Sequence, residues 1–103
     1  MVKICDKFNK KIDKYKSDAV YIIFYNSWCG YCHEAFDYLK TKKKNFKGYD
    51  IDNIKGGIER ILKCLNLNKD NTGFNPEHKT RPIIFYEGRF IGGFSDLQKV
   101  LGN

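Results

Sequence analysis

Hydrophobic residues fall into two kinds of spacing in the first quarter of this chain. Ile4, Phe8, Ile12 and Tyr15 recur at steps of three and four residues between lysines, which predicts an amphipathic helix packed against the domain. Residues 19–25 are instead a continuous run of β-branched and aromatic residues, typical of a strand buried on both faces. We therefore expect this strand at the centre of a sheet.

The apolar positions that follow predict a strand–helix–strand–helix order. A helix begins at or just after Cys29, and residues 46–52 fit a second strand. The next helix is opened by Gly56-Gly57, so the segment is a parallel βαβ unit followed by a further helix. Residues 66–80 are polar and rich in turn-forming residues, which predicts a long loop.

Two strands and a helix complete the pattern. Residues 82–87 and 89–92 flank Glu87-Gly88, which predicts a tight antiparallel hairpin, and a last short helix follows Ser95. The predicted fold class is α/β: a mixed four-stranded sheet flanked by helices on both faces, with an extra N-terminal helix. A length of 103 residues suits one domain spanning residues 1–103.

The composition is that of a globular protein without a membrane segment. Hydrophobic residues make up 42% of the chain, enough for a core despite 30% charged residues. The longest apolar run, residues 19–25, is far shorter than the roughly 18 residues of a membrane-spanning helix. The first residues carry charge where a secretory signal has an apolar stretch, so we expect a cytoplasmic protein with no membrane partner.

Positive charge is concentrated in the first half of the chain. The net charge is +7, and residues 1–47 contribute +6 through eleven basic and five acidic residues. The stretches 3–16 and 40–47 produce this field, which attracts anions of any kind. No recognised nucleic-acid motif accompanies the charge, so we interpret it as a solvated face and expect no nucleic-acid partner. Docking of this basic face to an acidic partner is the alternative.

Four cysteines in an intracellular chain favour catalytic, metal-binding or inert roles over a disulfide framework. Cys5 and Cys64 stand alone in helical patterns, and we expect them to be small core residues. Cys29 and Cys32 form a Cys-Gly-Tyr-Cys pair. With His33 the pair also satisfies the haem-attachment pattern, but the export signal and axial ligand of that class are missing, and structural zinc would need a second pair.

The pair suits thiol–disulfide exchange. Cys29 is predicted at a helix N-terminus, where unpaired N–H groups and the helix dipole favour the thiolate that exchange requires. Cys32 lies one turn further in and is more shielded, so it would attack the Cys29 sulfur to resolve a mixed disulfide. We assign Cys29 as the nucleophile and Cys32 as the resolving cysteine.

Three motifs now support a resemblance to a known family. They are Trp28-Cys-Gly-Tyr-Cys32, Thr80-Arg-Pro-Ile-Ile-Phe85 and Gly88-Arg-Phe-Ile-Gly-Gly-Phe-Ser-Asp-Leu97. With the element order they resemble the thioredoxin fold, and their order and spacing resemble the glutaredoxins from Ala19 to the C-terminus. The resemblance implies a glutathione-dependent thiol–disulfide oxidoreductase that reduces protein disulfides or glutathione mixed disulfides. Its implied partners are glutathione, as co-substrate, and disulfide-containing proteins, and we expect a monomer.

The resemblance also implies a site for the glutathione tripeptide. Pro82 should be cis and lie against the active cysteine, so that the backbone before it pairs with the substrate. The start of the last helix would take the γ-glutamyl carboxylate, and Asp96 the ammonium. The implied glutathione-binding residues are Tyr31, Thr80, Arg81, Pro82, Gly93, Ser95 and Asp96, with no metal ligand among them.

Departures from the family pattern leave two alternatives open. Asn26 stands where the family commonly has a lysine, a role that Arg81 or Lys79 would have to fill. Trp28 resembles the thioredoxins, so a thioredoxin-like protein-disulfide reductase is one alternative. The small Gly30 is compatible with the other, a glutaredoxin that bridges a [2Fe-2S] cluster between two subunits.

Overall fold

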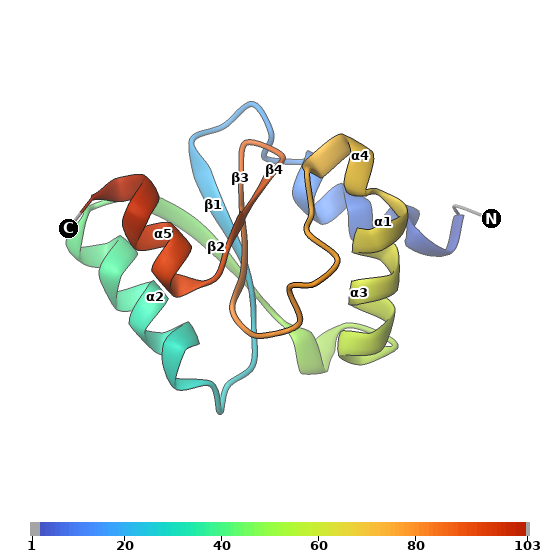
Figure 1. Ribbon diagram of the computed structural model, residues 1–103, viewed down its shortest axis with the longest axis horizontal. Helices are drawn as coiled ribbons and strands as arrows, with labels where there is room; N and C mark the ends of the chain where they lie inside the picture. Colours follow the sequence, from blue (N-terminus) through green and yellow to red (C-terminus); the bar gives the residue numbers. More distant parts are fainter. Residues whose placement is uncertain (1–2, 103) are drawn as a thin grey trace.

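One mixed sheet organises the molecule. The computed structural model describes residues 3–102, and the side chains of residues 3 and 4, including the apolar position predicted at Ile4, lie outside the described residues. The strands run in the order β2-β1-β3-β4 (Figure 1). Their bounds are β1 Val20–Tyr25, β2 Asn45–Asp50, β3 Ile83–Tyr86 and β4 Arg89–Gly92. As expected, β1 is central: it pairs in parallel with β2 and antiparallel with β3.

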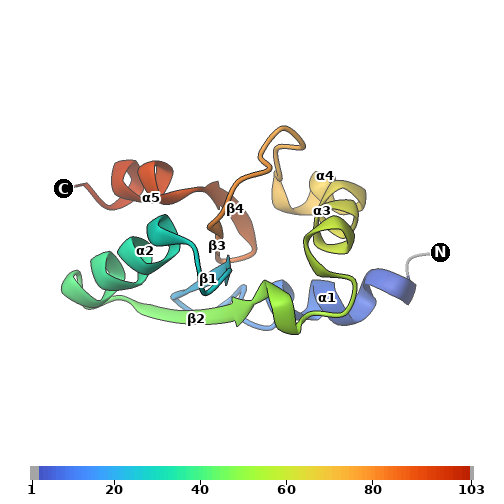
Figure 2. The ribbon, with the colours of Figure 1, turned by 90° about the horizontal axis from the view of Figure 1, so that it is seen from below.

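Helices cover both faces of the sheet (Figure 2). One face carries α1 (Lys3–Asp13), α3 (Gly57–Leu67) and the short α4 (Lys69–Thr72), and the other carries α2 (Gly30–Thr41) and α5 (Phe94–Leu101). A 3-10 turn, η1 (Ile51–Asn53), follows β2. The predicted architecture is confirmed, including the additional N-terminal helix.

The central position of β1 in the sheet explains why its sequence is continuously apolar. Ile22 and Phe24 face the core beneath α1 and α3, whereas Tyr21 and Ile23 face the core beneath α2 and α5. All four side chains are buried because successive strand residues point to opposite, equally covered faces. The hairpin prediction is also confirmed, since Glu87 and Gly88 both have positive φ, as a tight type I′ turn requires.

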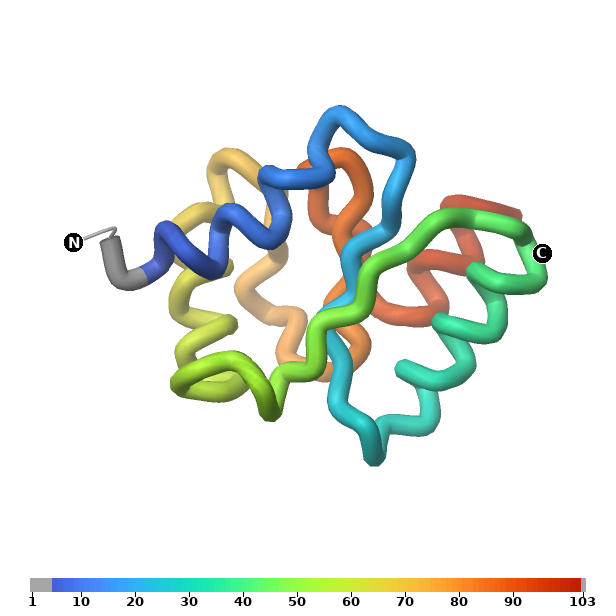
Figure 3. Tube along the Cα trace, turned by 180° about the vertical axis from the view of Figure 1, so that it is seen from behind, coloured from blue at the N-terminus to red at the C-terminus, as the bar shows by residue number. Residues whose placement is uncertain are grey.

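The prediction that Cys5 and Cys64 are isolated core residues was wrong in one respect. Cys5 and Cys64 are buried, as expected, but they are joined in a disulfide with their Cα atoms 5.5 Å apart. The bond links α1 to α3, which lie against each other on one side of the sheet (Figure 3). The residues are 59 positions apart, and helical periodicity shows which face is buried but not which helix it meets.

The prediction of a long loop over residues 66–80 was wrong in its first half. The helix α3 extends to Leu67, and α4 follows almost at once. Thr72 is buried and its hydroxyl accepts a hydrogen bond from the Phe74 N–H, while Phe74 packs edge-on against Phe90. Tertiary contact with β4 therefore orders a polar segment whose local sequence indicates turns.

Several element boundaries differ from the prediction by one or two residues: β1 begins at Val20, β2 begins at Asn45, and β3 spans Ile83–Tyr86 within the predicted range 82–87. The second strand ends at Asp50, because η1 begins at Ile51, and α5 begins at Phe94, ahead of Ser95. Over the described residues, no helix is both long and apolar enough to cross a membrane.

Candidate dithiol site and substrate groove

Cys29 caps the helix that follows the central strand. It is the N-cap residue of α2, with extended backbone angles, and its Sγ accepts a hydrogen bond from the backbone N–H of Cys32 at 3.1 Å. An N-cap acceptor normally comes from Ser, Thr, Asp or Asn, and here a sulfur fills that place. Negative charge on this sulfur is stabilised by the N–H group and by the helix dipole.

Cys32 lies one turn further along and is shielded from solvent. Its side chain is fully buried, whereas Cys29 keeps 6% of its surface exposed. Burial, together with a hydrogen bond to Cys29, raises the pKa of the Cys32 thiol to about 12. Both Cys29 and Cys32 are unpaired thiols, so this pair is in its reduced form, and Cys32 holds its proton at neutral pH.

The segment before β3 forms the other wall of the site. The Arg81–Pro82 peptide bond is cis, as the resemblance implied. A pocket of about 390 Å³ beside Cys29 is lined by residues 28–31 on one side and 79–81 on the other. Two segments about fifty residues apart in sequence therefore meet at the thiol.

A second pocket, of about 530 Å³, shares Tyr31, Thr80 and Arg81 with the first and extends toward α5. Six of the seven residues predicted to bind glutathione line it: Tyr31, Thr80, Arg81, Gly93, Ser95 and Asp96. The seventh, Pro82, is buried and its carbonyl oxygen lies 3.3 Å from Nε2 of His78. Because they share residues, we treat the two pockets as one feature, the thiol groove, which runs from Trp28 to the start of α5.

The helix α5 does not begin after Ser95, where the sequence predicted its start. The N-cap is Gly93, whose N–H donates to a carboxylate oxygen of Asp96 at 2.9 Å, so Ser95 is not the cap and is exposed. Gly92 has a φ of +130°, and a Cβ there would lie 2.6 Å from Cγ of Asp96. A glycine at position 92 therefore permits the close approach that holds the Asp96 carboxylate at the groove.

A polar network behind the groove was not predicted. Asn26 is buried at 3% exposure; its Oδ1 accepts from Nε of Arg81 at 2.8 Å, and its Nδ2 donates to Asp52 at 3.2 Å. The Arg81 guanidinium lies 5.4 Å from the ring centroid of Trp28, which is 68% exposed. Asn26 thus orients Arg81, the residue that the sequence suggested as a replacement for the missing lysine.

Three further residues of the groove were missed as site residues: Phe94, which lies within one of the quoted motifs, and His78 and Gln98, which do not. His78 was expected only as part of the loop, but its ring packs against Phe90 as well as near the Pro82 carbonyl. No motif marks His78 or Gln98, so only their proximity in three dimensions reveals them. Lys79 lines the thiol end of the groove and is exposed.

Within residues 3–102, no group of three or more His, Cys, Asp or Glu side chains is arranged to hold a metal ion. The arrangement at Cys29 and Cys32 is instead that of a dithiol: a nucleophile at a helix end, a protonated partner behind it, and a groove leading to the nucleophile.

Sequence comparisons identify relatives of one kind. A family model described as Glutaredoxin matches residues 19–91. A probable glutaredoxin of Acanthamoeba polyphaga mimivirus is 47% identical over 83 residues, which cover 81% of this chain and 78% of the relative. Glutaredoxin-2 of Schizosaccharomyces pombe is 29% identical over 86% of this chain and 74% of its own length.

Solved glutaredoxin structures have the same fold as this chain. The solution structure of a dithiolic glutaredoxin from Trypanosoma brucei brucei aligns with a TM-score of 0.65 at 27% identity, covering 86% of this chain and 82% of that one. A buckwheat glutaredoxin–glutathione complex aligns with a TM-score of 0.67 over 90% of this chain and 74% of that one, and its 22% identity supports the fold alone.

Proposed function

This chain belongs to the glutaredoxin family of thiol–disulfide oxidoreductases, and we propose that it reduces glutathione mixed disulfides and protein disulfides with Cys29 as nucleophile and Cys32 as resolving thiol. The observation that carries the proposal is the thiol groove. Six residues proposed for glutathione line one pocket that adjoins the Cys29 pocket and shares three residues with it.

The first step is attack of the Cys29 thiolate on the glutathione sulfur of a mixed disulfide. A bond forms between the two sulfurs while the original disulfide bond breaks, and the target protein leaves as a thiolate that takes a proton from water. Cys29 then carries glutathione. The Cys32 N–H that contacts Cys29 Sγ at 3.1 Å stabilises the attacking anion.

Two routes complete the cycle. A second glutathione thiolate attacks the glutathione sulfur on Cys29 and leaves as glutathione disulfide, which regenerates the Cys29 thiolate. Alternatively, Cys32 loses its proton and attacks the Cys29 sulfur, releasing glutathione and forming a Cys29–Cys32 disulfide that two glutathione molecules reduce. The buried, protonated state of Cys32 favours the first route while glutathione is plentiful.

We assign the ends of glutathione to the groove by charge. The Gly93 backbone and the first turn of α5 suit the γ-glutamyl carboxylate, and Asp96 suits the ammonium. Arg81, held by Asn26 at 2.8 Å, suits the glycine carboxylate. The Thr80–Arg81 backbone before cis-Pro82 would pair with the cysteinyl part of the tripeptide.

The test is reduction of a small glutathione mixed disulfide, coupled to glutathione reductase. We expect activity in the wild type and in Cys32→Ser, and loss of at least a hundredfold in Cys29→Ser, because only Cys29 has an open approach from the groove. Loss of activity in Cys32→Ser with retention in Cys29→Ser would reverse the assigned roles. An inactive wild type that still reduces an insoluble protein disulfide with a dithiol reductant would favour the thioredoxin-like alternative.

No observation on the described residues favours the [2Fe-2S] alternative over the dithiol function, and it stays a sequence-based prediction. A single domain over residues 1–103, a monomeric state and a cytoplasmic location likewise remain proposals from the sequence.

A further inference from the structure

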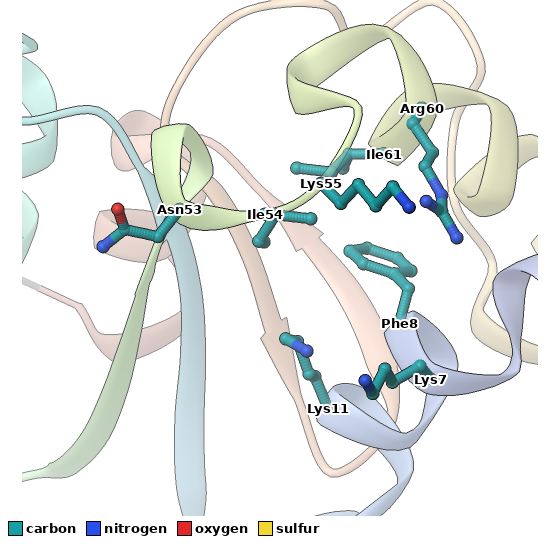
Figure 4. Close-up of a pocket in the computed structure, with 8 residues that line it drawn as sticks. All are labelled: Lys7, Phe8, Lys11, Asn53, Ile54, Lys55, Arg60 and Ile61. Atoms are coloured by element: carbon teal, nitrogen blue, oxygen red, sulfur yellow. The ribbon is translucent and has the colours of Figure 1, made fainter.

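A third pocket lies away from the thiols, between α1 and the segment that leads from η1 into α3. Its volume is about 470 Å³, and it shares no lining residue with the thiol groove. One wall comes from α1 and the other from residues 53–61, as Figure 4 shows. We call it the basic pocket.

Four cationic side chains line the basic pocket. Lys7 and Lys11 are one turn apart on α1 and so project from the same face of that helix, while Lys55 and Arg60 come from the opposite wall. In Figure 4 they lie on two sides of the Phe8 ring, Lys55 and Arg60 above it and Lys7 and Lys11 below. No Asp or Glu is among the residues that line the pocket.

The inner surface of the basic pocket is apolar. Phe8 and Ile61 are 5% and 0% exposed, and Ile54 packs partly buried against the same core. Hydrophobic surface weakens the screening of nearby charges, so cations at its edge attract an anion more strongly than cations in open water.

The local structure holds these cations near one another. Gly56 has a φ of +88°, and a Cβ there would lie 2.6 Å from Cδ of Arg60, so glycine lets the Arg60 side chain fold over the loop that carries Lys55. The Cys5–Cys64 disulfide ties α1 to α3 and hence one wall to the other. Lys11 is further placed by its contact with the Tyr49 ring, 5.6 Å from Nζ to the centroid.

The three lysines of the basic pocket come from both walls and repel one another, and no carboxylate is among the lining residues, so a multivalent anion would relieve this repulsion. A single carboxylate or chloride would offset one charge, whereas adjacent phosphate groups span both walls and meet cations on each. We propose that the basic pocket binds a small anion with several adjacent phosphate groups, either free polyphosphate or the triphosphate of a nucleotide. This inference is independent of the thiol chemistry.

Calorimetric titration at about 0.15 M salt, where charges beyond roughly 8 Å are screened, tests the proposal. The probes are inorganic tripolyphosphate and adenosine triphosphate, added to the wild type and to Lys7→Ala/Lys55→Ala. Both substituted side chains are exposed, one on each wall, so folding is unaffected, which the unfolding temperature checks. We expect the double substitution to weaken binding at least tenfold.

The matched control is Lys44→Ala/Lys99→Ala, which removes the same charge from exposed positions outside the pocket. It should change affinity less than twofold. Equal weakening in the two double variants, or no binding by the wild type at millimolar probe, would overturn the proposal. If the wild type binds and only Lys7→Ala/Lys55→Ala weakens binding, the two probes identify the source of the phosphates. Equal affinity for both probes means that the pocket recognises the phosphate groups alone. Tighter binding of adenosine triphosphate means that its base or sugar also contacts the protein.

Discussion

At the scale of single residues, two cysteines three positions apart have very different surroundings. Cys29 caps α2 at the groove, and its sulfur accepts the Cys32 N–H, whereas Cys32 is enclosed by the core beneath α2. The local pattern Cys-x-x-Cys before an amphipathic helix was enough to predict this difference, because a helix N-terminus and the first buried turn follow from spacing alone.

The difference predicts selective alkylation. Burial raises the pKa of the Cys32 thiol to about 12, so below pH 9 Cys32 is protonated and unreactive, and its thiolate fraction rises only in strongly alkaline solution. Brief treatment of the reduced protein with iodoacetamide between pH 7 and 9, followed by peptide mapping, should therefore label Cys29 and leave Cys32 unmodified. Labelling of Cys32 at a comparable rate would contradict the burial argument.

A second prediction at the scale of single residues concerns the proposed contact between Arg81 and glutathione. A charge-assisted hydrogen bond contributes about 1.5–3 kcal/mol, and Arg81 is only half-buried, so the lower end applies. We expect Arg81→Ala to raise KM for the glutathione mixed disulfide roughly tenfold with little change in kcat, since the contact binds substrate and transition state alike. Lys99→Ala, the single-charge control on α5, should leave KM unchanged, and an unchanged KM in Arg81→Ala would remove that residue from the glutathione site.

The structural role of Asn26 could not be predicted from the sequence. From the sequence it is only a departure from the family's lysine, whereas in the structure it is a buried amide that joins Arg81 to Asp52. The three residues lie in separate segments, and no periodicity brings them together. Their contact depends on the turn after β1 meeting both η1 and the cis-Pro82 segment.

At the scale of elements, strands and helices with strong hydrophobic periods were predicted correctly, and the elements formed by tertiary contact were not. β1 and α2 follow directly from their patterns, but α4 lies in a polar stretch that Phe74 and Phe90 order through packing. The Cys5–Cys64 bond was missed for the same reason, since each cysteine fits its own helix and nothing local indicates its partner.

That disulfide predicts a stability effect at this scale. It closes a loop with a sequence separation of 59, for which chain entropy gives about 4 kcal/mol of stabilisation. In a Cys29→Ser/Cys32→Ser background, reducing the protein in denaturant and refolding it should lower the unfolding temperature by roughly ten degrees or more. The same background with Cys5→Ala/Cys64→Ala should not respond to the reductant. Equal unfolding temperatures for the oxidised and reduced forms would contradict a stabilising role.

At the scale of the whole molecule, the sheet separates the thiol groove from the basic pocket. The thiol groove lies between the start of α2, the cis-Pro82 segment and α5, while α1 and α3 on the opposite face form the basic pocket. The sequence predicted the first region because its residues occur in recognisable motifs. It indicated the second only as an excess of lysine in the first half of the chain, since Lys55 and Arg60 come from beyond that half.

The central claim is that Cys29 forms the covalent bond with glutathione. Intact-mass and peptide mass spectrometry of Cys32→Ser after incubation with glutathione disulfide tests it most directly, because removal of the resolving thiol traps the intermediate. The account predicts one added glutathionyl group, located on Cys29, and none in Cys29→Ser under the same conditions. An unmodified Cys32→Ser protein, or a glutathionyl group attached at Cys5 or Cys64 in place of Cys29, would contradict it.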